Sequence, residues 1–278
     1  MRIPGGKPEG EPQGRTLKEK RFTQHYLLPD KGDGIGQMRI LIVRHGDPAY
    51  EIDGLTETGK KEALLLAPRL ASIPVTDFYV SPLGRARQTL QPALDMLGRE
   101  AQVLDWLKEF SAELDINGSG FLQKAYPGTP RDAQGHYEPR IVWDMLPGAW
   151  MKDEKNFEPE AWRTSETAKH SDMEEVYRRT CEGLDALLAR YGYIREGGMY
   201  VTEKGSDATI VLVCHFGITA VMLSHLWSVS PHILLHVLSM APSSVTEIYT
   251  EERVKGEVVF RTARVICTGH VTDHALIT

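Results

Sequence analysis

Basic and imidazole side chains stand where apolar, strand-like runs of this sequence end. Arg44 and His45 follow one such run, and Arg85 comes shortly after another. His215 follows the most strand-like run in the chain. Arginine carries forked N–H donors that match the oxygens of a phosphoryl dianion, and helix N-termini add free backbone N–H groups. These residue types indicate a pocket for a phosphorylated, anionic group.

The basic residues can converge only if the runs before them are neighbouring strands of one sheet. The three runs are residues 38–43, 77–80 and 209–214. Each is short and apolar, which is typical of strands buried in a parallel sheet. Because open α/β sheets bind their ligands at the carboxyl ends of the strands, we expect all four side chains to meet at that edge.

Helix signals alternate with these strands. A helix is predicted after Gly59 with Thr56 or Thr58 as its N-cap, and a second with Ser81 as N-cap and Pro82 as its first helical residue. A long amphipathic helix is predicted over residues 172–191. Alternating strands and helices predict an α/β fold, a three-layer α/β/α sandwich with a mainly parallel sheet.

Further elements complete this expectation. A strand over residues 103–107 would end just before Glu109. Residues 218–227 and a segment after Pro231 are predicted to be helical. Residues 245–250 and 258–262 are predicted to form a β-hairpin.

Two stretches fall outside this alternating pattern. Residues 1–37 are rich in Gly, Pro, Lys and Arg without an apolar period, and we expect a flexible extension before a single domain over residues 38–278. Residues 111–169 carry many Gly and Pro residues together with three tryptophans. A loop-rich segment of this length favours an insertion that acts as a lid, with packing over a sheet edge as the alternative.

The amino-acid composition limits the partners and the cellular compartment that we expect for the protein. The net charge of −6 argues against a nucleic-acid partner, so an anionic substrate must be held by locally concentrated Arg and His. The three cysteines are widely spaced and odd in number, which favours a reducing cytoplasm. Polar residues interrupt the apolar stretch 208–238, and the N-terminus has no apolar signal-peptide region, so we expect no membrane association. The oligomeric state stays open.

Four motifs occur in a fixed order, with Glu109 between the last two. They are Arg44-His45-Gly46, Leu55-Thr56-Glu57-Thr58-Gly59, Ser81-Pro82-Leu83-Gly84-Arg85-Ala86-Arg87-Gln88-Thr89 and Cys214-His215-Phe216-Gly217. Together they resemble the histidine phosphatase superfamily, in its phosphoglycerate-mutase-like branch. The resemblance covers roughly residues 38–110 and 205–262.

The resemblance implies roles for these residues. His45 would attack phosphorus and form a phosphohistidine, and the nearby cations Arg44 and Arg85 would keep it neutral. The phosphoryl group would be bound by Arg44, Arg85, His215, Gly46 and Phe216. Glu109 would protonate the leaving alkoxide and then activate water, while His215 would stabilise the transition state. No metal or other cofactor is implied.

Some assignments have neighbouring alternatives. Arg87 competes with Arg85, although the spacing after Ser81-Pro82 favours Arg85. Glu113 competes with Glu109, because the Gly and Trp-Glu-Gly residues that commonly follow this glutamate in the family are absent. No metal ligands are assigned among five further histidines, which have no partnering Cys or Asp cluster. These are His225, His232, His236, His270 and His274.

Residues 47–54 help to decide between a phosphatase and a mutase. Cofactor-dependent mutases of the family usually carry an Asn and a Trp-Asn pair there, and this chain has neither. We therefore expect a phosphomonoesterase that acts on a small phosphorylated metabolite. A phosphoglycerate-mutase-type phosphotransferase is the first alternative. The second is a non-catalytic module that binds a phosphorylated ligand, but the intact set of His45, Arg85 and His215 argues against it.

Overall fold

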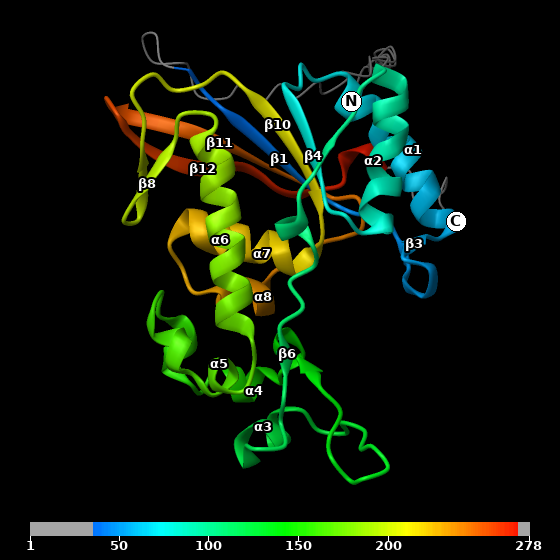
Figure 1. The fold of residues 1–278 in the computed structure, drawn as a ribbon, viewed down its shortest axis with the longest axis vertical. Helices are drawn as coiled ribbons and strands as arrows, with labels where there is room; N and C mark the ends of the chain where they lie inside the picture. Colours follow the sequence, from blue (N-terminus) through cyan, green and yellow to red (C-terminus); the bar gives the residue numbers. More distant parts are fainter. Residues whose placement is uncertain (1–35, 272–278) are drawn as a thin grey trace, which may run out of the picture. The chain divides into compact units, whose positions relative to one another are not determined.

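An eight-stranded mixed sheet forms the centre of the computed structural model, which describes residues 36–271. The predicted extension over residues 1–37 therefore lies almost wholly outside the described residues. Along the sheet the strands follow the order β5-β4-β10-β1-β11-β12-β9-β8 (Figure 1). Their bounds are β1 Arg39–Arg44, β4 Asp77–Val80, β5 Gln102–Val103, β8 Ile194–Glu196, β9 Met199–Val201, β10 Thr209–Cys214, β11 Val245–Val254 and β12 Glu257–Cys267.

The sheet has a parallel and an antiparallel half. Strands β5, β4, β10 and β1 pair in parallel, whereas β11, β12, β9 and β8 continue the sheet antiparallel. The reason is local, because β11 and β12 are joined by a tight turn with Gly256 at a φ of 86°. The predicted α/β fold is confirmed, and its parallel part is the half that carries the motifs.

Helices cover both faces of the sheet, as expected (Figure 1). On one face α1 (Glu57–Ala71) and α2 (Gly84–Leu97) pack on Leu41 and Val43 of β1. On the other face α6 (Met173–Ala189), α7 (Phe216–Trp227) and α8 (Pro231–Val237) pack on Ile40 and Ile42. Because side chains alternate along a strand, one run of apolar residues supplies both cores.

Residues 111–169, called the insertion below, are built from short elements with a small core of their own. The elements are β6 Glu113–Leu114, α3 Gly120–Ala125, β7 Arg140–Ile141, η3 Val142–Asp144, α4 Pro147–Trp150, η4 Glu154–Phe157, η5 Ala161–Thr164 and α5 Glu166–Lys169. Their core contains Ile116, Leu122 and Trp150. Of the other tryptophans, Trp162 is fully buried in the main core, and Trp143 is half-buried against it.

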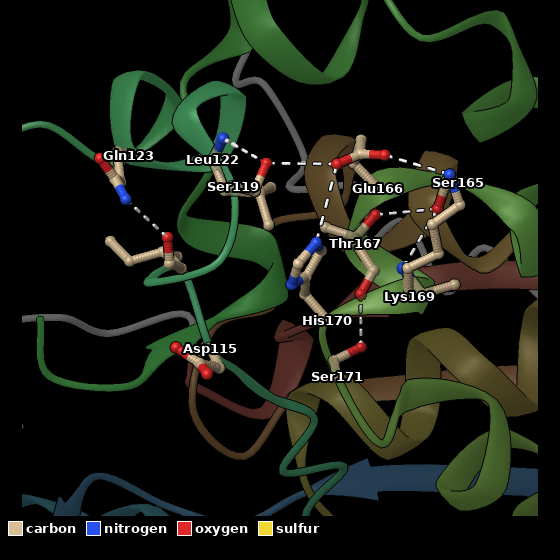
Figure 2. Close-up of polar contacts among 12 residues, drawn as sticks. Asp115, Ser119, Leu122, Gln123, Ser165, Glu166, Thr167, Lys169, His170 and Ser171 are labelled. Carbon is tan, nitrogen blue, oxygen red and sulfur yellow. Dashed lines mark hydrogen bonds and ion pairs between the residues drawn. The ribbon is translucent and has the colours of Figure 1, made fainter.

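Polar contacts tie the first part of the insertion to its last part (Figure 2). The Ser119 hydroxyl donates to Glu166 Oε2 at 3.2 Å, and Glu166 also pairs with Lys169 at 3.1 Å. A backbone hydrogen bond of 2.9 Å runs from Asp115 N to the carbonyl of His170. These bonds close the segment on itself, so it is a packed unit.

Two local predictions are wrong. Helix α2 begins at Gly84, and Ser81 does not cap it. The chain is still extended at Ser81, whose N–H donates to Val213 of the neighbouring strand at 2.9 Å. The strand expected over residues 103–107 pairs only at Gln102–Val103, and Asp105–Leu107 forms the 3-10 helix η2 instead.

Other elements complete the description. Thr56 is the N-cap of α1, with its hydroxyl accepting from Gly59 N. The remaining short elements are β2 Pro48–Ala49, η1 Tyr50–Ile52, β3 Gly54–Leu55 and η6 Gly269–Val271. Among the described residues, no helix combines the length and apolarity needed to cross a membrane.

Candidate active site

The three motif-bearing strands end level with one another. In the parallel register, Val43 of β1 lies beside Val213 of β10, which lies beside Val80 of β4. The next residues along each strand therefore emerge at the same edge, called the sheet edge below. This places the rings of His45 and His215 with centroids 5.0 Å apart.

His45 is held through one of its two ring nitrogens. Its Nδ1 lies 2.7 Å from the carbonyl oxygen of Gly46, and a carbonyl can only accept, so Nδ1 carries the proton and Nε2 has the lone pair in the neutral ring. Burial, and then the charges of Arg44 and Arg85, lower the pKa of His45 to about 4. At neutral pH the side chain is therefore an uncharged imidazole with an available nucleophilic nitrogen.

The backbone of Gly46 helps to hold the ring of His45 in place. Its N–H donates to Thr89 Oγ1 at 2.9 Å, so both of its backbone polar groups are used inside the protein. A Cβ at Gly46 would lie 2.9 Å from the carbonyl oxygen of Gly59, at the start of α1. Glycine is needed here for close packing against that helix, and a direct contact between Gly46 and substrate stays a prediction.

Two guanidinium groups lie beside the histidines. Arg44 is fixed by a hydrogen bond from Nη1 to the carbonyl of Met240, and Arg85 by one of 2.7 Å to Asp53 Oδ1. The Nε atoms of both arginines are buried and have no hydrogen-bond partner among the described residues. Each arginine is thus anchored on one side and retains donors for an anion. The alternative Arg87 is exposed and lines a separate surface cavity.

Asp53 is a contributor that the sequence did not reveal. Its Oδ2 accepts from Gly84 N at 2.6 Å, so this carboxylate caps α2 while Oδ1 holds Arg85. A Cβ on Gly84 would lie 2.1 Å from the carbonyl oxygen of Asp53, so the contact requires glycine. The Asp53-Gly54 pair is a turn signal, but nothing in the sequence connects it to the start of α2.

His215 is the second imidazole of the site and is fully buried. Its Nε2 lies 2.8 Å from Ser81 Oγ, and its Nδ1 has no partner among the described residues. Burial, followed by the charges of Arg85 and Arg44, lowers its pKa to about 2. His215 is therefore a neutral group at the N-cap of α7.

Glu109 lies at the same helix terminus. Its Oε1 accepts from Phe110 N at 2.9 Å and from Ile218 N, in the first turn of α7, at 3.2 Å. Burial raises the pKa of the carboxyl, although these hydrogen bonds and Arg85 oppose the shift. The alternative Glu113 is exposed and lines a separate cavity within the insertion. The structure therefore brings Glu109, and not Glu113, to the sheet edge.

The insertion reaches the site through one aromatic contact. The ring of Trp143 meets Phe216 edge-on, with centroids 5.7 Å apart. Glu109 Oε1 and Trp143 Cη2 both lie within 3.1 Å of the position that a Cβ on Gly217 would take. The tryptophan thus borders the carboxyl of Glu109, and substrate binding by Phe216 stays a prediction.

Four of the five histidines to which no metal was assigned have structural partners. His225 Nε2 lies 2.9 Å from Asp185, and His232 Nε2 lies 3.3 Å from Thr167. His236 stacks on Trp150, and His270 accepts from Arg69 at 3.1 Å. His274 lies outside the described residues. Within residues 36–271, no three His, Cys, Asp or Glu side chains are placed to hold a metal ion.

Comparisons with known proteins agree with this geometry. A family model of the histidine phosphatase superfamily (branch 1) matches residues 40–134. No curated protein sequence matches the chain. Similar solved structures include mycobacterial hydrolase 2, with 19% identity, a TM-score of 0.56, and coverage of 86% of this chain and 95% of that one.

Two further structures carry descriptions of activity. A mycobacterial glucosyl-3-phosphoglycerate phosphatase has 17% identity and a TM-score of 0.53, over 83% of this chain and 99% of that one. A phosphoserine phosphatase from Entamoeba histolytica, in complex with 3-phosphoglyceric acid, has 16% identity and a TM-score of 0.51, over 84% and 99%. At such identities the likeness establishes the fold.

The family match and the fold together confirm the resemblance that the motifs indicated. Over residues 40–134 the chain matches the histidine phosphatase superfamily (branch 1), and its fold is shared with the similar solved structures named above.

Proposed function

We propose that the protein hydrolyses a small phosphorylated metabolite through a phosphohistidine intermediate on His45. The observation that carries this proposal is a neutral imidazole whose Nδ1 is held by the Gly46 carbonyl, which leaves the lone pair on Nε2, beside two anchored arginines. A nucleophile of this kind divides one difficult displacement into two easier ones.

In the first step, His45 Nε2 attacks phosphorus, the ester P–O bond breaks, and Glu109 gives its proton to the departing alkoxide. In the second step, Glu109 takes a proton from water as the water oxygen attacks the phosphohistidine. Inorganic phosphate leaves, and His45 and Glu109 return to their starting states. Proton transfer by a positioned carboxyl contributes about 10²- to 10⁴-fold to such rates.

Charge stabilisation comes from donors that surround the phosphoryl oxygens. The unpartnered Nε atoms of Arg44 and Arg85 and the buried ring of His215 supply donors for these oxygens. Because negative charge is spread over the phosphoryl oxygens in the transition state, preorganised donors of this kind stabilise it in addition to the covalent step on His45.

The substrate class rests on the surroundings and on the fold's relatives. The Trp143–Phe216 pair borders the site, which supports a role for the insertion as a lid that shapes the substrate pocket. The similar structures that are described as phosphatases act on glucosyl-3-phosphoglycerate and phosphoserine, which are small phosphorylated metabolites. The cysteines at 181, 214 and 267 are unpaired, which supports a reducing, cytoplasmic setting for the proposed enzyme.

The test is hydrolysis of p-nitrophenyl phosphate, followed by a panel of phosphorylated metabolites. We expect turnover by the wild type, loss of turnover in Arg85→Ala, and near wild-type turnover in the matched control Arg87→Ala. Tight phosphate binding without any turnover would support the non-catalytic module instead. Transfer between the 2- and 3-positions of phosphoglycerate, faster than hydrolysis, would support the phosphotransferase.

A further inference from the structure

The two ring nitrogens of His215 lie in different surroundings. Nε2 lies 2.8 Å from the hydroxyl oxygen of Ser81, whereas Nδ1 is buried and has no partner among the described residues. A neutral imidazole carries only one N–H, so one nitrogen is a donor and the other an acceptor. Which one carries the proton decides what His215 presents to a phosphoryl group.

The hydrogen bonds of Ser81 determine the answer. Its oxygen already accepts from the N–H of Leu83 at 3.3 Å, and the only other side-chain contact of this hydroxyl in the described chain is with His215. If Nε2 donated to Ser81, the hydroxyl proton would be left buried without an acceptor, which is costly. If the hydroxyl donates to Nε2, every polar group of the pair except Nδ1 is satisfied.

We propose that Ser81 is a positioning residue that fixes His215 in the tautomer with the proton on Nδ1. The buried nitrogen then offers an N–H next to Arg44 and Arg85, where the proposed function places the phosphoryl oxygens. In the opposite tautomer, Nδ1 would direct a lone pair toward the anion and repel it. The role of this N–H in binding phosphate rests on the proposed function. The tautomer itself is a property of the protein without substrate and can be tested separately.

The backbone holds Ser81 in place for this role. Its N–H donates to Val213, two residues before His215, at 2.9 Å. Ser81 and His215 are both fully buried, so water does not compete for the hydroxyl. This is also why Ser81 is not available to cap α2: its side chain faces the neighbouring strand end.

Nitrogen NMR on the full chain with labelled histidine reads the tautomer directly, because protonated and unprotonated ring nitrogens have widely separated ¹⁵N shifts. The resonances of His215 are assigned by their loss in His215→Gln. We expect a protonated Nδ1 and an unprotonated Nε2 in the wild type at neutral pH. A protonated Nε2 would overturn the proposal, without any measurement of activity.

Variants of Ser81 test the consequence. Ser81→Ala removes the donor, and we expect its His215 spectrum to shift toward the other tautomer and its kcat for p-nitrophenyl phosphate to fall about tenfold, the effect of one hydrogen bond. Ser81→Thr retains the hydroxyl and should keep both the tautomer and a kcat within about threefold of wild type, provided that its melting temperature shows normal folding. An unchanged tautomer in folded Ser81→Ala would contradict the role of Ser81. If the wild type hydrolyses nothing, the proposed function fails, and the spectra still decide the tautomer.

Discussion

The sheet edge and the insertion hold their side chains by different physical means. At the sheet edge, three paired strands in a fixed register deliver His45, Ser81 and His215 to one place. In the insertion, short helices and turns are held by a small apolar core and by polar contacts such as Ser119–Glu166. A register leaves little freedom for a side chain, whereas short elements can be rearranged without disturbing the sheet. The difference suggests that the sheet edge carries the chemistry and the insertion adapts it to a substrate.

Replacement of His45 at the sheet edge is expected to have the largest effect on activity, and a matched change in the insertion almost none. His45→Ala removes the nucleophile, and we expect kcat/KM for an aryl phosphate to fall by roughly 10⁴- to 10⁶-fold. The exposed Phe121 of the insertion provides the matched control, and Phe121→Ala should remain within about twofold. If folded His45→Ala retained a tenth or more of the wild-type activity, the sheet edge could not be the region that carries the chemistry.

Glu109→Gln is expected to have the next largest effect. The amide can still accept from Ile218 N but cannot give a proton, so kcat for substrates with poor leaving groups should fall by about 10²- to 10⁴-fold. A substrate with a good leaving group, such as p-nitrophenyl phosphate, should lose less in the first step. Glu113→Gln is the control. If Glu113→Gln lowered kcat more than Glu109→Gln does, Glu113 and not Glu109 would be the general acid.

Trp143 is where the two regions meet, and its replacement tests how the insertion acts on the chemistry. Burial raises the pKa of Glu109, and a protonated carboxyl is the form that serves as the acid. Trp143→Ala admits water beside Glu109, so the pKa should fall and the alkaline limb of the kcat profile should move to lower pH. Trp143→Phe retains an apolar ring and should show a smaller shift. An unchanged profile in Trp143→Ala would mean that the insertion does not tune the acid.

Acid sensitivity should arise at two places, because a buried neutral histidine lies at each: His45 at the sheet edge, and His232 of α8 beside Thr167 of the insertion. Burial lowers the pKa of His45 to about 4 and of His232 to about 3, below the ordinary value of 6.5. Between pH 6.5 and about 4 the unfolded chain therefore binds protons that the folded chain does not, so stability is full above pH 6.5 and declines as pH falls.

Calorimetry at pH 7 and pH 5 measures this decline. We expect the melting temperature to be several degrees lower at pH 5, and the difference to be smaller in His232→Leu. Equal melting temperatures at the two pH values in the wild type would contradict the burial of neutral histidines.

The residues at the sheet edge were predictable from the sequence. A short apolar run indicates a buried strand of a parallel sheet, and a charged residue at its end must therefore lie at the edge of that sheet. Arg44, His45, Arg85 and His215 were placed together on this basis, and Glu109 was added from the family resemblance; the structure brings all five together. The capping prediction failed because Ser81 continues the strand pairing, and the actual cap, Asp53, comes from a loop that only the folded chain brings near.

The insertion was not predictable in the same way. Its 3-10 helices and four-residue helices are too short to show a hydrophobic period. The hairpin of β8 and β9 was missed for a similar reason, since its strands have three residues each. Only the three tryptophans signalled that the segment is packed.

The central claim is that His45 is phosphorylated during turnover. The direct test mixes the enzyme rapidly with a phosphorylated substrate, quenches in alkali, and locates phosphate by mass spectrometry. We expect a base-stable, acid-labile phosphate on the peptide containing His45, formed before steady state and absent in His45→Ala. Turnover without this modification, or phosphate on a different residue, would contradict it.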